Sequence, residues 1–125
     1  MRVLLDTHVA FWFFEDPDLL GKTARDVIED PDTIVYLSAA SVWEWALKRA
    51  RGRTSMPGDM AEGAARAGFT ELPVTWLHGR EAAGLPAIHR DPFDRMLVAQ
   101  AVAEDLVLVT RDRTIPRYDV ATMPA

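Results

Sequence analysis

The chain lacks the residues and segments that several protein classes need. It contains no cysteine, which excludes disulfide bonds and thiolate zinc sites. No apolar stretch approaches the ~20 residues of a membrane-spanning helix. The start, Met1-Arg2 followed by apolar residues, faintly resembles a signal peptide, but Asp6 and His8 interrupt the run and no small-residue cleavage site follows. We therefore expect a cytoplasmic protein with no membrane partner.

The sequence also lacks an excess of positive charge. Its formal net charge is −5 at pH 7 over 125 residues. Simple nucleic-acid binders usually carry a basic surface that neutralises phosphate, so this charge argues against that class. An acidic chain can still act on nucleic acid if metal ions and a local basic rim reverse the field at the site. No P-loop, Gly-rich dinucleotide motif or Ser-His-Asp arrangement is recognisable.

What is present is an alternation of strand and helix patterns. The 49% apolar content fits a globular core, and the length fits a single domain over residues 1–125. We expect strands at residues 2–5, 33–37, 69–74 and 106–110, with a weaker fifth that includes 118–121. Helical patterns fill the intervals, and one of these helices opens at Ser38 or Ser41 and stops at Gly52. This order predicts a three-layer α/β domain with a mainly parallel sheet flanked by helices.

Four carboxylates stand beside separate apolar runs in this pattern. They are Asp6, Glu44, Asp94 and Asp112. In a parallel sheet the crossover helices begin at the carboxyl edge, so we expect all four to face that one rim, where open α/β folds bind ligands. Acids beside apolar runs are costly to desolvate unless something pairs with them. Several converging acids favour a hard cation such as Mg²⁺ or Mn²⁺.

Each acid also has a purely structural interpretation. Asp6 could cap the helix after the first strand, and Asp112 could be a turn residue. The segment 41–44, Ser-Val-Trp-Glu, matches a capping box, in which the Glu would bond the backbone of the cap. Asp91, followed by Pro92, is a good start for the helix that carries Asp94. The residues alone leave these alternatives open.

Four segments taken together resemble PIN-domain ribonucleases, and most closely the VapC-type toxins of bacterial toxin–antitoxin pairs. The resemblance covers essentially the whole chain and is most specific at Asp91–Ala101. The matching segments are Leu-Leu-Asp6-Thr-His, Ser41-Val-Trp-Glu44 with Lys48, Asp91-Pro-Phe-Asp94-Arg-Met-Leu-Val-Ala-Gln-Ala and Val-Thr110-Arg-Asp112.

The resemblance implies a five-stranded, mainly parallel sheet and a Mg²⁺- or Mn²⁺-dependent endoribonuclease. By residue matching, the implied metal ligands and catalytic acids are Asp6, Glu44, Asp94 and Asp112. Asp91 is a weaker candidate that fits a cap or a supporting group, and Thr110 would orient a carboxylate or a metal-bound water. The implied partners are an RNA substrate, a cognate VapB-like antitoxin and a second copy of the chain in a homodimer.

Basic and aromatic residues near the acids are candidates for RNA and partner contacts. Lys48 could pair with Glu44 or, with Arg49, Arg51 and Arg53, grip phosphates; Arg90 and Arg95 are comparable. These cations could instead complement a helix dipole and stay solvated. The aromatic run 11–14, with Trp43 or Trp45, suggests an apolar partner surface.

Two further interpretations concern the histidines and the class of protein. His8, His78 and His89 lack metal-ligand spacing, so we expect structural or peripheral roles for them. The alternative to an enzyme is a noncatalytic PIN-like interaction module with a degenerate metal pocket, against which the complete set of four acids argues.

Overall fold

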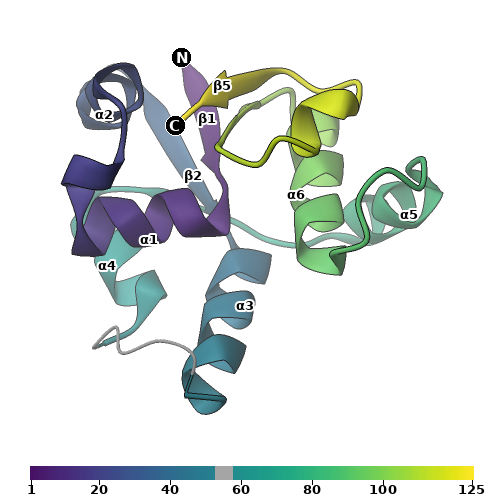
Figure 1. Ribbon diagram of the computed structural model, residues 1–125, viewed down its shortest axis with the longest axis horizontal. Coiled ribbons are helices and arrows are strands. Elements are labelled where there is room, and N and C mark those ends of the chain that lie inside the picture. The colour runs from purple at the N-terminus through teal and green to yellow at the C-terminus, as the bar shows by residue number, and fades with distance from the viewer. Residues whose placement is uncertain (53–57) are drawn as a thin grey trace.

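Five short strands form one parallel sheet in the order β3-β2-β1-β4-β5 (Figure 1). The computed structural model describes residues 1–52 and 58–125. The strands are β1 (Arg2–Leu5), β2 (Ile34–Ser38), β3 (Thr70–Leu72), β4 (Val107–Thr110) and β5 (Thr122–Pro124). The prediction of an α/β fold with a parallel five-stranded sheet is therefore confirmed.

Helices connect the strands and cover both faces of the sheet. They are α1 (Thr7–Glu15), α2 (Lys22–Glu29), α3 (Ala39–Ala50), α4 (Met60–Arg66), α5 (Trp76–Gly84) and α6 (Pro92–Ala103), with 3₁₀ turns at Pro17–Leu19 and Ile115–Arg117. In the described part of the chain, no helix combines the length and apolar character needed to cross a membrane.

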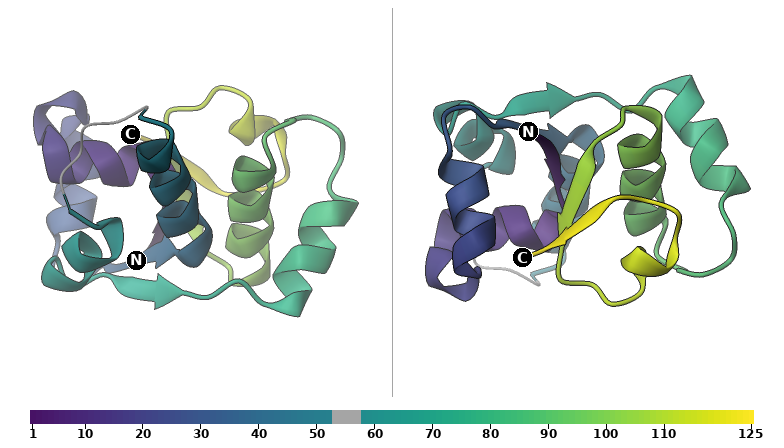
Figure 2. Two further views of the ribbon diagram at one scale, coloured as in Figure 1. Left: turned by 90° about the horizontal axis from the view of Figure 1, so that it is seen from below. Right: turned by 90° about the horizontal axis from the view of Figure 1, so that it is seen from above.

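The central strand β1 divides the core into two layers. Val3 and Leu5 are fully buried against α1, α2, α3 and α4, whereas Leu4 is fully buried on the opposite face against α6. Alternate residues of a strand point to opposite faces of the sheet. A strand that is covered on both faces therefore needs apolar residues at successive positions, as β1 has at residues 3–5. The predicted three layers are confirmed, and Figure 2 shows α5 lying outside α6 on the second face.

Local signals explain where two functional helices begin and where one ends. Ser38 caps α3 by accepting a hydrogen bond from the Ala40 N–H at 3.0 Å. Asp91 caps α6, with Pro92 at the first helical position. Gly52, just past the end of α3, has φ +68°, a conformation that glycine adopts without strain. The choice between Ser38 and Ser41 is resolved in favour of Ser38, and the predicted stop at Gly52 is confirmed.

The fifth strand is displaced from its predicted position. It runs over Thr122–Pro124, whereas the sequence pattern suggested a strand that includes 118–121. Tyr118 is instead buried in the core beyond a 3₁₀ turn, and its apolar ring is used there rather than in a strand. Pairing with β4 starts only at Ala121, whose carbonyl accepts the Leu108 N–H at 2.9 Å.

Ser38 gives a test of how the helices are tied to the sheet. Its hydroxyl caps α3 and also donates to Gln100 Oε1 of α6 at 2.6 Å, in a fully buried setting. We expect Ser38→Ala to lower the free energy of unfolding by about 2–3 kcal/mol, because it removes a cap and leaves a buried amide oxygen unpaired. Urea unfolding would measure this loss. Thr23→Ala on the exposed face of α2 is the control and should stay within about 0.5 kcal/mol of wild type.

Candidate active site at the carboxyl edge of the sheet

A cavity of about 400 Å³ lies at the carboxyl edge of the sheet, and all four predicted acids line it. Asp6 directly follows β1, Glu44 lies in the second turn of α3, Asp94 lies in the first turn of α6, and Asp112 lies two residues past β4. The other lining residues are His8, Trp12, Lys48, Asp91 and Arg111. The structure thus brings together the acids that strand-end geometry predicted to meet.

Asp6 is held by a side chain from β4, the neighbour of β1 in the sheet. It is 7% exposed, and its Oδ2 accepts a hydrogen bond from the Thr110 hydroxyl at 2.7 Å. Burial raises the pKa of Asp6, although the Thr110 hydrogen bond acts in the opposite direction. Asp6 occupies the cap position of α1, but its side chain makes no capping hydrogen bond. Capping therefore does not explain this carboxylate.

Thr110 connects two of the acids. Besides donating to Asp6, its hydroxyl oxygen accepts the backbone N–H of Asp112 at 3.0 Å. The same hydroxyl therefore fixes the Asp6 carboxylate and the start of the loop that carries Asp112.

Glu44 has one paired and one unpaired oxygen. Its Oε2 forms an ion pair with Lys48 Nζ at 3.2 Å, one helical turn away. Its Oε1 is buried and has no hydrogen-bond partner among the described residues. The capping-box interpretation of Ser41 and Glu44 is wrong, because α3 begins at Ala39 and the Ser41 hydroxyl is engaged by Thr7 at 2.9 Å instead. An unpaired carboxylate oxygen in a buried position is costly, and it points to a ligand.

Asp94 is a strongly perturbed acid of the cavity. Burial, together with the neighbouring carboxylates of Asp6 and Asp91, raises its pKa from 3.8 to about 7. Asp91 holds the helix end that carries it, since Asp91 Oδ1 accepts the N–H groups of Phe93 at 2.8 Å and Asp94 at 3.4 Å. The cap role expected for Asp91 is therefore confirmed.

Asp112 serves both its own loop and the cavity. Its Oδ1 accepts the backbone N–H groups of Thr114 at 2.6 Å and Ile115 at 3.2 Å, which is the predicted turn role. Its Oδ2 lies 3.0 Å from His89 Nε2. Burial acts to raise the pKa of Asp112, but the hydrogen bonds from His89, Thr114 and Ile115 outweigh it and lower the pKa.

His89 is the site residue that the sequence analysis missed. Its Nε2 lies 3.0 Å from Asp94 Oδ2 and 3.0 Å from Asp112 Oδ2. Burial alone would lower its pKa, but the hydrogen bond to Asp112 and the carboxylates of Asp94 and Asp91 raise it. Of the structural or peripheral roles expected for His89, its contacts with two of the acids do not fit the peripheral one, and a structural role remains a prediction. Its place five residues before Asp94, ahead of the Asp91 cap, was the available signal.

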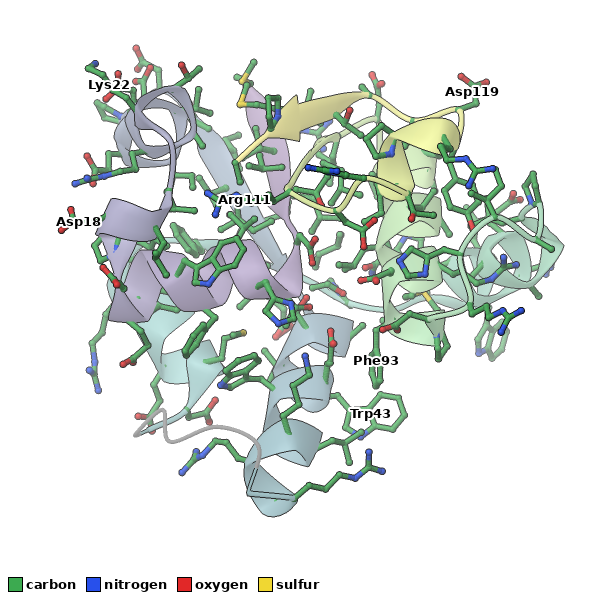
Figure 3. The ribbon with its side chains drawn as sticks, viewed as in Figure 1. Asp18, Lys22, Trp43, Phe93, Arg111 and Asp119 are labelled. Carbon is green, nitrogen blue, oxygen red and sulfur yellow. The ribbon has the colours of Figure 1, made fainter. Side chains whose placement is uncertain are left out.

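The basic residues contribute less to the cavity than their number suggests. Lys48 lines it, whereas Arg95 donates to the main-chain oxygens of Ala82, Leu85 and Pro86 and so ties α6 to the end of α5. Arg53 lies outside the described residues. A cation not considered from the sequence, Arg111, lines the cavity and lies over the Trp12 ring at 4.5 Å (Figure 3).

The aromatic run is used mainly in the core. All four residues of 11–14 pack against the core cluster on the α1 face, and Phe11 stacks on the buried Trp45 at 4.4 Å. Of the aromatic residues considered for a partner surface, Trp43 is exposed, at 62%, and it packs edge-to-face on Phe93 at 5.1 Å. Figure 3 shows this pair bridging α3 and α6.

The side chains of the cavity fit a divalent cation. Asp94 and Asp112 offer carboxylate oxygens that lie within 4.8 Å of each other and of the ring nitrogen of His89. Glu44 adds an unpaired buried oxygen. The pKa of Asp94 is raised by burial and by repulsion from Asp6 and Asp91, and a cation would offset both effects. Oxygen-rich sites of this kind favour Mg²⁺ or Mn²⁺.

Residues 3–121 match the PIN domain family. The chain belongs to the PIN-domain family. It is 31% identical over 121 residues to ribonuclease VapC22 of Mycobacterium tuberculosis, which covers 90% of this chain and 88% of that protein. The resemblance to PIN-domain ribonucleases of the VapC type that the motifs suggested is thus confirmed.

Solved structures share this PIN fold over nearly the whole chain. A chain of VapBC2 from Rickettsia felis, bound to a promoter DNA fragment, has a TM-score of 0.75 at 11% identity and covers 100% of this chain and 99% of its own. FitAB bound to the IR36 DNA fragment has a TM-score of 0.64 at 22% identity, with 99% and 94% covered. FitAcB from Neisseria gonorrhoeae has a TM-score of 0.60 at 23% identity, with 98% and 96% covered.

The raised pKa of Asp94 predicts how stability depends on pH in the absence of metal. A carboxyl whose pKa is raised in the folded state contributes stability that is present below its ordinary pKa of 3.8 and is lost as the pH rises through about 7. We expect the free energy of unfolding, measured with urea in EDTA, to fall between pH 5 and pH 8. Asp94→Asn should remove roughly 1–3 kcal/mol of that fall. An unchanged slope in Asp94→Asn, with exposed Asp119→Asn as control, would contradict the assignment.

Proposed function

We propose that this PIN-domain protein is a Mg²⁺- or Mn²⁺-dependent endoribonuclease that hydrolyses phosphodiester bonds in RNA. One observation carries the proposal: Asp6, Glu44, Asp94 and Asp112 line a single cavity in a chain 31% identical to a VapC ribonuclease. The unpaired oxygen of Glu44 and the crowding of carboxylates around Asp94 support a cation there.

The proposed metal ligands are the four acids, with the cation contacting Glu44 through its unpaired Oε1. When bound, such a cation lowers the pKa of a coordinated water and stabilises the oxygens of the phosphodiester as it is cleaved. Thr110 would keep the Asp6 carboxylate in one orientation through its 2.7 Å hydrogen bond. Asp91 would act through the helix end that it caps rather than by direct contact.

Two cations of the cavity are the proposed contacts for RNA phosphates. The side chain of Lys48 is 25% exposed and is already paired with Glu44. Its ammonium group can therefore contact a phosphate only next to that carboxylate. Arg111 lies on the cavity wall over Trp12. These two positive charges would partly offset the acidic wall for an incoming polyanion, as an acidic nuclease requires.

The proposed partners follow from the VapC-like assignment. We propose a VapB-like antitoxin that neutralises the nuclease, and a homodimer in which the exposed Trp43 and the half-buried Phe93 contribute to the contact between copies. The structures with the same fold come from VapBC and FitAB assemblies, which supports an antitoxin partner. Since the proposed substrate is RNA, the proposed place of action is the cytoplasm.

A metal titration tests the site without requiring the correct RNA. Mn²⁺ at about 100 times its dissociation constant should stabilise the wild-type protein by ~2.7 kcal/mol, which corresponds to a rise of roughly 10 °C in melting temperature. Asp6→Asn and Asp94→Asn should each remove most of that rise. If millimolar Mn²⁺ neither raises the melting temperature nor binds by calorimetry, the metal site is absent. A purely capping role of these acids predicts a small loss of stability and no metal effect.

RNA cleavage tests the activity itself. Purified, antitoxin-free protein should cut total RNA from the native host into discrete fragments with Mn²⁺ and not with EDTA. Asp6→Asn and Asp94→Asn should reduce cleavage by at least ~100-fold, because each removes a ligand of the proposed cation. End mapping of the fragments identifies the target. Folded protein that binds Mn²⁺ but cuts no host RNA would favour the noncatalytic interaction module.

A further inference from the structure

The imidazole of His89 bridges two acids that come from distant parts of the chain. Its Nε2 is 3.0 Å from Asp94 Oδ2 in α6 and 3.0 Å from Asp112 Oδ2 beyond β4. The Nε2–H is hydrogen-bonded to Asp112 Oδ2, whereas Asp94 Oδ2 lies beside the same nitrogen at ion-pair distance. His89 is thus the direct link between these two walls of the cavity.

The other ring nitrogen fixes which tautomer forms this link. Nδ1 faces the backbone N–H of Asp91 at 3.2 Å. A backbone N–H can only donate, so Nδ1 must accept, and the proton of the neutral ring is on Nε2. An Nε2 that carries this proton has no free lone pair for a metal ion. The geometry therefore favours His89 as a hydrogen-bond donor to metal ligands rather than as a ligand itself.

The backbone of His89 is also anchored to the core. The His89 backbone N–H donates to the Tyr118 hydroxyl at 2.8 Å, and Tyr118 is 5% exposed in the core. The side chain of His89 is 18% exposed. Asp91, whose N–H fixes the ring, is also the cap of the helix that carries Asp94. His89 and Asp94 are therefore linked through the same helix cap.

We propose that His89 is a positioning residue that helps to hold Asp94 and Asp112 in a metal-binding arrangement, by donating its Nε2–H to Asp112 and by keeping its ring beside the Asp94 carboxylate. This inference rests on the proposed metal-dependent function and assigns to it a residue outside the four acids. Loss of a hydrogen-bond partner of metal ligands typically weakens metal affinity 10–100-fold. The same loss is expected here.

Two substitutions of similar size separate the hydrogen bond from the space that the ring fills. Gln keeps an N–H donor at the end of its side chain, whereas Leu has none. Calorimetric titration with Mn²⁺ at pH 8 should give a dissociation constant within about 3-fold of wild type for His89→Gln. For His89→Leu it should be about 10–100-fold weaker. The melting temperature of each metal-free variant reports folding separately.

Equal Mn²⁺ affinity in wild type and folded His89→Leu would overturn the proposal, as would equal weakening in His89→Leu and His89→Gln. Electron spin echo spectra of bound Mn²⁺ give an independent result: a directly coordinated ¹⁴N would make His89 a ligand and overturn its role as a donor. These outcomes leave the nuclease proposal intact. If the wild-type protein bound no Mn²⁺ at all, the proposed function would fail together with the role of His89.

Discussion

The parallel pairing of β1 with both β2 and β4 is the constraint on which the cavity depends. Val3 is in register with Val35 on one side and with Val107 on the other, so the three strands end at the same edge. Asp6, the start of α3 and the loop with Asp112 are thereby delivered to one place. Burying β1 on both faces makes this register strict, because a slip of one residue would exchange the sides on which Leu4 and Leu5 are packed.

That convergence creates an electrostatic problem that neighbouring groups reduce but do not remove. The Thr110 hydroxyl supports Asp6, Lys48 neutralises one oxygen of Glu44, and His89 lies between the other two acids. The pKa of Asp94 nevertheless stays near 7, and one Glu44 oxygen remains unpaired. A raised carboxyl pKa and an unpaired buried oxygen are typical of sites that a ligand completes.

The sequence predicted the fold and the convergence of the four acids well, because both follow from local patterns. Apolar runs mark the strands, and acids at their carboxyl ends must meet once the sheet is parallel. The same reasoning failed for His89, since its contact with Asp112 depends on how two loops far apart in sequence pack, which no spacing rule encodes. It also misplaced the fifth strand, because the buried Tyr118 ring and a strand residue look alike in a short apolar segment. Arg95 was a reasonable cavity candidate by position, but its guanidinium is engaged by carbonyls at the end of α5.

The hydrogen bond between Thr110 and Asp6 spans 104 residues. During translation β1 is made well before its partner β4, because the two strands lie far apart in the sequence. A nascent chain or a fragment cut short before β4 therefore has no cavity edge on that side and no support for Asp6. The acidic cavity is therefore completed only when a segment made much later joins the sheet beside β1.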